Sequence, residues 1–170
     1  MKTLKVLGIS GSGKTTLIKE TISRNQGVLH LSYSALLKEY GNKADKYWWH
    51  FLSKNDSLIL IDEHLEFNLM DAIRIEKYRK ENTCGLLMLH VEPEEILFRR
   101  FNDLTRLDRA KNIEEIILHQ EILYKRAREM ADALEIPLRI LKNATVEESI
   151  MALETIFHDS IIKIGLARDA

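Results

Sequence analysis

Residues 8–15 have the types and spacing needed to hold a chain of phosphates. They read Gly-Ile-Ser-Gly-Ser-Gly-Lys-Thr and satisfy the pattern G-x4-G-K-[ST] at every required position. Glycines at such a turn let successive backbone N–H groups point at phosphate oxygens. The amine of Lys14 can reach the β and γ phosphates of a nucleotide, and the hydroxyl of Thr15 can coordinate Mg²⁺. The motif therefore predicts a binding site for a nucleoside triphosphate with Mg²⁺.

The setting of this motif favours a phosphate loop over a plain glycine turn. It lies between a predicted strand and a predicted helix, and the amino end of a helix carries the positive end of its dipole. A chance match to the whole pattern has a probability of about one in a hundred at average composition. We assign nucleotide binding here to Ser10, Gly11, Ser12, Gly13, Lys14, Thr15 and Thr16.

A carboxylate at the end of a neighbouring buried strand commonly holds the metal of such a site. The apolar run 58–61 is followed by Asp62, with Glu63 and His64 directly after it. We expect Asp62 to hold Mg²⁺ through water, together with Thr15. The alternative for Asp62 is a helix cap or a solvated turn. His64 fits a structural histidine as well as one that orients an acceptor.

Basic residues gather in and just before a polar stretch at 102–112. They are Arg99, Arg100, Arg106, Arg109 and Lys111, with Asp103 and Asp108 among them. Transfer of a phosphoryl group builds charge on its oxygens, and mobile arginines can clamp that charge while excluding water. We expect a short lid here, with Arg106 and Arg109 as catalytic residues beside Lys14. A solvated charged face is the alternative.

Two further motifs have both a structural and a functional interpretation. Residues 42–45 match N-K-x-D, the guanine-recognition pattern of GTP-binding switches, but they precede the predicted metal-binding strand instead of following it. We therefore treat this match as coincidence. Trp48 and Trp49 lie in a helical pattern, where core packing is favoured over a stacking wall for an acceptor.

Apolar runs and helical spacings alternate along the chain and define the elements that must position these residues. The predicted strands are 4–7, 28–31, 58–61, 84–91 and 138–141, and the predicted helices are 15–24, 34–40, 44–53, 69–80, 93–101, 113–134 and 145–158. The apolar strands lack the alternating pattern of half-exposed sheets, which favours strands buried on both faces. The sequence predicts one three-layer α/β domain over residues 1–170, with a mostly parallel five-stranded sheet. We place acceptor-site helices at about 32–54 and the lid at about 102–112, and we expect a loose tail from residue 164.

Composition narrows the class of protein. The 170 residues are 45% hydrophobic and 30% charged, as in soluble globular proteins. With 25 basic and 26 acidic residues, the chain is too balanced for nucleic-acid binding through its overall charge. A single cysteine, Cys84, excludes a disulfide within these residues and favours a cytoplasmic location. Because no apolar run approaches the roughly 20 residues of a membrane helix, we expect neither a membrane span nor a secretory signal.

Taken in order, these segments resemble the adenylate kinase family, and in particular its archaeal-type branch. Beyond the phosphate loop, the likeness is carried by residues 31–34 (Leu-Ser-Tyr-Ser), 62–64 (Asp-Glu-His), 95–101, 105–106 and the helix that holds His119 and Gln120. The resemblance implies a P-loop fold, an ATP donor with Mg²⁺, and a nucleoside monophosphate as the small-molecule acceptor. It also implies that Arg100 lies against the donor adenine, that Asn143 lies where the backbone meets the adenine, and that Arg106 contacts the transferring phosphoryl group.

The chain departs from that family on the acceptor side. Residues 34–53 contain no arginine, although adenylate kinases typically place one there on the AMP phosphate. Lys38, Lys43 or Lys46 would act only as point charges without bidentate geometry. The stretch after His64 also lacks the Gly/Pro-rich acceptor loop of the archaeal-type enzymes. Two alternatives therefore stay open: a kinase for another small metabolite, and a slow ATPase that acts as a nucleotide-dependent binding protein.

Overall fold

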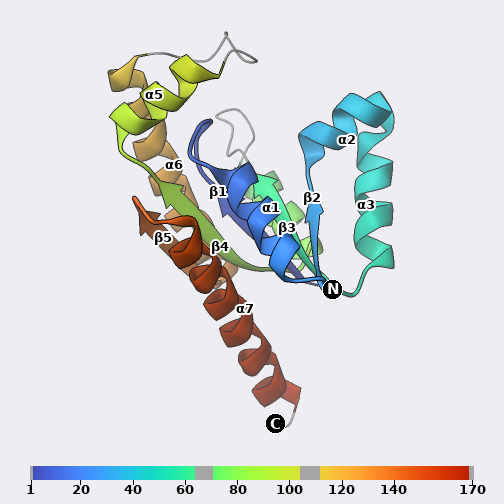
Figure 1. Ribbon diagram of the computed structural model, residues 1–170. Helices are drawn as coiled ribbons and strands as arrows, with labels where there is room; N and C mark the ends of the chain where they lie inside the picture. Colours follow the sequence, from blue (N-terminus) through green and yellow to red (C-terminus); the bar gives the residue numbers. More distant parts are fainter. Residues whose placement is uncertain (1, 64–70, 104–111, 169–170) are drawn as a thin grey trace.

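A computed structural model describes residues 2–63, 71–103 and 112–168. Its centre is a parallel five-stranded sheet with the strand order β2-β3-β1-β4-β5 (Figure 1). The strands are β1 (Lys2–Leu7), β2 (Val28–Leu31), β3 (Leu58–Glu63), β4 (Thr83–His90) and β5 (Leu138–Lys142). This arrangement confirms the prediction of a parallel three-layer α/β fold. Buried apolar runs of this kind require helices on both faces of the sheet.

The helices follow the predicted spans closely. They are α1 (Lys14–Arg24), α2 (Tyr33–Tyr40), the 3₁₀ turn η1 (Gly41–Lys43), α3 (Ala44–Lys54), α4 (Asp71–Lys80), α5 (Pro93–Asn102), α6 (Ile113–Leu134) and α7 (Val146–Arg168). Their ends carry recognisable signals. Asn112 caps α6 by accepting a hydrogen bond from the backbone N–H of Glu114 at 2.8 Å, and Pro93 opens α5.

Two layers of helices bury the two faces of the sheet. On one face, α1 and α7 cover a cluster that includes Leu4, Val6, Leu17 and Leu153. On the other face, α4 and α6 cover a cluster that includes Leu7, Tyr78, Leu86 and Ala127. Alternate residues of β1 thus face opposite layers, as the two-residue period of a strand requires.

The α2–α3 hairpin lies beside β2 at one edge of the sheet (Figure 1). It packs against β2 and β3 through a smaller cluster that contains Leu31, Trp48, Leu52, Ile59 and Ile61. Trp48 is 2% exposed and belongs to the core, as expected from its helical spacing. Trp49 is 40% exposed and is not part of this cluster.

The predicted end of the chain is wrong in one respect. We expected the closing helix to stop near residue 158 and a loose tail from residue 164, whereas α7 continues to Arg168. The segment contains one glycine and no proline, and an isolated glycine lowers helix propensity without ending a helix. Within the ranges that the structure describes, no helix is long and apolar enough to cross a bilayer.

Candidate active site

The loop between β1 and α1 has the shape that its glycines predict. Gly8 takes φ +158°, and a Cβ there would collide with the side chain of Ser12. Gly11 takes φ +96°, a conformation that L side chains rarely adopt, and its Cβ would meet Ile96 Cγ2 at 3.4 Å. Residues 8–13 therefore form a narrow turn that leads directly into the amino end of α1.

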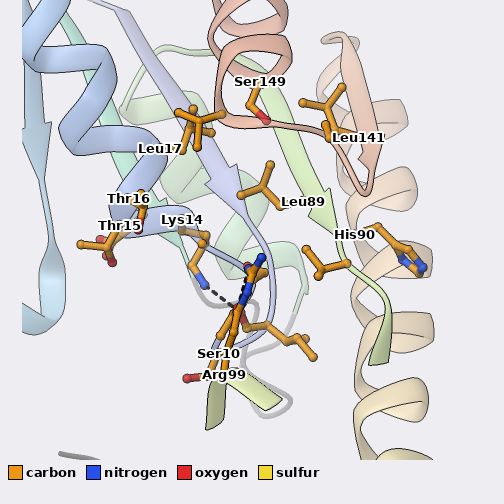
Figure 2. A pocket seen from close by; sticks show the side chains of 18 of the residues that line it. Ser10, Lys14, Thr15, Thr16, Leu17, Leu89, His90, Arg99, Leu141 and Ser149 are labelled. Atoms are coloured by element: carbon orange, nitrogen blue, oxygen red, sulfur yellow. Dashed lines mark hydrogen bonds between the residues drawn. The ribbon is translucent and has the colours of Figure 1, made fainter. Parts of the chain in front are cut away.

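The amine of Lys14 is folded back over this turn. Its Nζ donates a hydrogen bond to the carbonyl oxygen of Gly8 at 2.5 Å, and the carbonyl oxygen of Ile9 lies at 3.4 Å. Figure 2 shows the side chain of Lys14 pointing into the loop, beside Ser10 and Arg99. The side chain is buried and lines the cavity of the site. Its positive charge therefore faces any group that enters the loop.

The loop also contains a hydrogen-bonding group that is free to bind a phosphate. The hydroxyl of Ser12 is buried and has no hydrogen-bond partner in the described structure. A buried hydroxyl in this state is costly unless a ligand or water satisfies it. Ser12, Lys14 and the amino end of α1 together fit an anion.

Asp62 reaches the same place from β3. In the parallel pairing of β1 with β3, Asp62 lies opposite Val6. Val6 is two residues before Gly8, so Asp62 lies at the carboxyl end of the sheet, close to the start of the phosphate loop. Its side chain is 14% exposed, and its Oδ1 lies 3.6 Å from Nε2 of His30 on β2. Asp62 and Thr15 line one cavity, and a carboxylate with a hydroxyl is a donor set that suits Mg²⁺.

This cavity has a volume of about 600 Å³ and extends across the carboxyl ends of the strands. Residues 9–17 form its floor, Ser34 and Asp62 line it toward β2 and β3, and Leu141, Ala144, Val146 and Ser149 line it toward β5 and α7 (Figure 2). Ligands of open α/β sheets bind at this edge, where the strand order reverses. The lining is mixed apolar and polar on the β5 side, whereas Ser34 and Asp62 on the β3 side are both polar.

Asn143 joins the ends of β4 and β5 beside this cavity. Its backbone N–H donates to the carbonyl oxygen of His90 at 2.9 Å, and its side chain exchanges hydrogen bonds with Glu92 at 2.6 and 2.9 Å. Asn143 has φ +50°, and the next residue, Ala144, lines the cavity. The side chain of Asn143 thus fixes the loop whose backbone borders the cavity.

Two consecutive arginines of α5 donate hydrogen bonds to the backbone of the phosphate loop. Arg100 is 3% exposed, and its Nε donates to the carbonyl oxygen of Ser10 at 3.0 Å. Arg99 donates from Nη1 to the carbonyl oxygen of Gly11 at 3.2 Å and pairs with Glu95 at 2.8 Å. Arg99 lines the cavity, whereas Arg100 is buried against the loop.

The structure brings only part of the predicted constellation together. Arg106, Arg109, Lys111 and His64 lie outside the described residues. The N-K-x-D residues belong to η1 and the start of α3, where Asp45 accepts a hydrogen bond from Tyr33 Oη at 2.9 Å. Trp49 is not among the described residues that line the cavity of the site. It borders a separate shallow groove with Ile73, Glu76, Lys77 and Lys80.

Two further residues support this site, and the sequence alone assigned a role there to neither of them. His30 stands beside Asp62 because β2 pairs with β3 in parallel, with His30 opposite Leu60. Gln120, buried in α6, exchanges hydrogen bonds of 3.0 and 3.2 Å with the backbone of Val91 at the end of β4. Neither contact leaves a local signal in the sequence, although the position of His30 follows once the register of the strands is known.

Known proteins that are similar to this chain in sequence or in structure are kinases. No family model matches the chain. An adenylate kinase of Thermoplasma acidophilum is 25% identical over 140 residues, which cover 69% of this chain and 76% of that protein. Among solved structures, the shikimate kinase of Acinetobacter baumannii in complex with shikimate has a TM-score of 0.63 at 16% identity and covers 92% of this chain and 93% of its own.

Two further kinases share the architecture. A gluconokinase from Sinorhizobium meliloti has a TM-score of 0.59 at 15% identity, with 95% of this chain and 97% of that chain covered. The deoxyadenosine kinase of M. mycoides has a TM-score of 0.50 at 15% identity, with coverages of 94% and 99%. The chain has the fold of the P-loop kinases, a fold that these proteins combine with different acceptors.

Proposed function

We propose that this protein is a P-loop kinase that transfers the γ-phosphoryl group of ATP, bound with Mg²⁺, to a small acceptor. The observation that carries this proposal is the juxtaposition of Lys14, the buried hydroxyl of Ser12 (unpaired among the described residues), and Asp62 around one cavity at the carboxyl edge of the sheet. We place the base on the β5 side of the cavity, where the lining is partly apolar, and the acceptor on the β3 side. The adenylate kinase relative and the kinase neighbours support the same class of reaction.

Each residue of the loop has a role in this scheme. Lys14 releases the carbonyl oxygens of Gly8 and Ile9 and binds the β and γ phosphates. The hydroxyl of Thr15 and, through water, the carboxylate of Asp62 would hold Mg²⁺, which when bound offsets negative charge on the phosphates. Arg106 and Arg109 are the residues we propose to stabilise the charge that develops during transfer.

The reaction needs no covalent enzyme intermediate. An oxygen of the acceptor forms a bond to the γ phosphorus while the bond from that phosphorus to the β-phosphate oxygen breaks, and ADP leaves. A phosphate oxygen of a nucleoside monophosphate is already ionised, whereas a hydroxyl acceptor must lose its proton. Asp62 and Asp103 both line the cavity, and Asp62 is the carboxylate that we propose to receive this proton. Positioning and electrostatics supply most of the acceleration.

For the acceptor, we propose a nucleoside monophosphate, on the strength of the likeness to adenylate kinases. The alternative is another small metabolite that presents a hydroxyl group. Two observations favour it: residues 34–53 contain no arginine, and the described lining toward β2 and β3 consists of Ser34 and Asp62. Shikimate and gluconate kinases show that the same fold can serve such acceptors.

The experiment that tests the proposal measures ADP formation from Mg-ATP with AMP, CMP, UMP, GMP, shikimate or gluconate, and with no acceptor. We expect rapid turnover with one of them and loss of that turnover in Lys14→Ala. Turnover with a monophosphate would identify the acceptor class, and turnover with a hydroxy acid would favour the alternative. Slow turnover that is equal with and without every acceptor would contradict a kinase for these compounds and favour an ATPase.

A further inference from the structure

A lysine is buried in the middle of the sheet, on the face opposite α1. Lys5 belongs to β1, between the fully buried Leu4 and Val6, and its own exposed fraction is 0%. An aliphatic residue would be the ordinary choice at this position, because a buried charge loses its hydration. Burial lowers the pKa of Lys5, and the carboxylates of Glu81 and Glu63 oppose that shift.

The partner of Lys5 is the equally buried Glu81, in the turn between α4 and β4. Lys5 Nζ donates to Glu81 Oε2, and the second carboxylate oxygen, Oε1, accepts a hydrogen bond of 2.7 Å from the indole Nε1 of Trp48. A strand of the central sheet is thereby connected through one carboxylate to α3. Trp48 is the largest side chain in the cluster that attaches the α2–α3 hairpin to the sheet.

The connection continues to the start of α2. The ring of Tyr33 meets Trp48 edge to face, with centroids 5.7 Å apart, and Lys77 of α4 lies over both rings at 5.2 and 4.8 Å. Lys77 Nζ also lies 3.8 Å from Glu81 Oε1. Tyr33 is the neighbour of Ser34, which lines the acceptor side of the cavity.

The same lysine contacts the strand that carries Asp62. Lys5 Nζ lies 3.9 Å from Oε2 of Glu63, which directly follows Asp62. One buried charge thus touches the residue after Asp62 and, through Glu81 and Trp48, the helix pair that carries Ser34.

We propose that Lys5, Glu81 and Trp48 form a positioning unit that sets the place of the α2–α3 hairpin, and with it Ser34, relative to the phosphate loop. A buried ion pair is weak evidence for stability, because apolar residues of similar size often serve a core as well or better. Directional contacts instead select one arrangement of packed elements over others. The assignment of this unit to acceptor binding rests on the proposed kinase function, whereas its effect on the hairpin does not.

The test replaces the ion pair by neutral side chains of similar length, Lys5→Met with Glu81→Gln. Amide hydrogen exchange is followed in α2 and α3 and, for comparison, in α1 and β1, and the free energy of unfolding is measured in urea. We expect exchange in α2 and α3 to become about tenfold faster than in the wild type, with little change in α1 and in unfolding. The matched control is Lys80→Met with Glu76→Gln, an exposed ion pair of 3.5 Å on α4, which should leave exchange in both regions unchanged.

A second variant, Trp48→Phe, keeps an aromatic ring but removes the indole donor to Glu81, and it should also accelerate exchange in α2 and α3. Trp49→Phe, one residue along the same helix, is its control. Exchange that rises equally in all elements, in step with a loss of unfolding free energy, would overturn the positioning role in favour of a purely structural one. Unchanged exchange in α2 and α3 would overturn it as well.

The kinetic readout distinguishes this proposal from the proposed function. With whichever acceptor the wild type phosphorylates, the double variant should raise the KM for the acceptor about tenfold and leave the KM for Mg-ATP within about twofold. A rise in both KM values by the same factor would contradict a specific link to the acceptor side. If the wild type phosphorylates none of the compounds tested, the kinase proposal fails for them, while the exchange measurements still decide whether the unit positions the hairpin.

Discussion

The Nε of Arg100 donates a hydrogen bond of 3.0 Å to the carbonyl oxygen of Ser10, so a helix that begins at Pro93 is tied to the phosphate loop. Arg100 is buried at this contact, and the resemblance to adenylate kinases implies in addition that it lies against the donor adenine. The described contact makes Arg100 a support of the loop. Because α5 leads into the predicted lid, the loop and the lid share this helix.

Replacing Arg100 by Met should weaken the binding of ATP and of inorganic tripolyphosphate by the same factor, about tenfold. One hydrogen bond from a charged donor has about this value, and both ligands need the loop in its native shape. Calorimetric titration of both ligands checks this prediction, with Arg128→Met, an exposed arginine of α6, as the control. A loss confined to ATP would show that Arg100 acts on the adenine instead.

Replacing Asp62 by Asn should lower turnover about a hundredfold and weaken ATP binding only when Mg²⁺ is present. An amide cannot supply the negative charge that a metal ion prefers, and the carboxylate of Asp62 repels the phosphates when no metal is bound. The measurement is the affinity for ATP with Mg²⁺ and with a chelator. A loss of ATP affinity by the same factor with Mg²⁺ and with the chelator would indicate that Asp62 supports the fold of the site and does not hold the metal.

Gly85 marks a point where β4 and α7 touch closely. A Cβ there would collide with Cγ2 of Ile156, so Gly85→Ala should reduce the free energy of unfolding by about 1–3 kcal/mol through overpacking. Urea denaturation measures this change. Gly27→Ala is the control, because a Cβ at Gly27 meets nothing within 4 Å, and its effect should stay within about 0.5 kcal/mol. Equal effects of the two variants would contradict the close packing of α7 on β4.

The amino end of α7 should contribute a pH-dependent term to stability. Hydrogen bonds from the backbone and the hydroxyl of Thr145 lower the pKa of Glu148 below its ordinary value of 4.5. A lowered pKa in the folded state means that the contribution is present above pH 4.5 and is lost as the pH falls through the folded pKa. Glu148→Gln should therefore lower the Tm at pH 7, and the difference from the wild type should shrink at pH 3.

Thermal unfolding at both pH values checks this prediction, with Glu121→Gln on the exposed face of α6 as the control. A difference between the wild type and Glu148→Gln that grows toward low pH would contradict it.

The sequence predicts the fold and the loop because both depend on local patterns. The glycine spacing of residues 8–13 determines the turn, and apolar runs without alternation indicate a parallel sheet with two helical layers. The place of Asp62 beside the loop then follows from parallel pairing, since the carboxyl ends of β1 and β3 meet at one edge.

Contacts between distant positions are not predictable in this way. Glu81 lies 76 residues from Lys5 and 33 from Trp48, and Arg100 lies 90 residues from Ser10. Each of these pairs depends on the packing of a helix against the sheet, and no periodicity within either segment specifies it. Lys5 shows no distinctive signal, because a single lysine in an apolar run is equally typical of an exposed strand position.

The central claim is that the γ-phosphoryl group leaves ATP for an acceptor and not for water. The most direct measurement follows the label of ATP carrying ³²P at the γ position, with Mg²⁺ and the acceptor panel, in the wild type and in Lys14→Ala. The account predicts that the label appears in a phosphorylated acceptor far faster than in inorganic phosphate, and that Lys14→Ala loses at least about a hundredfold of this transfer. Label that appears only in inorganic phosphate, at one rate with every acceptor, would contradict it.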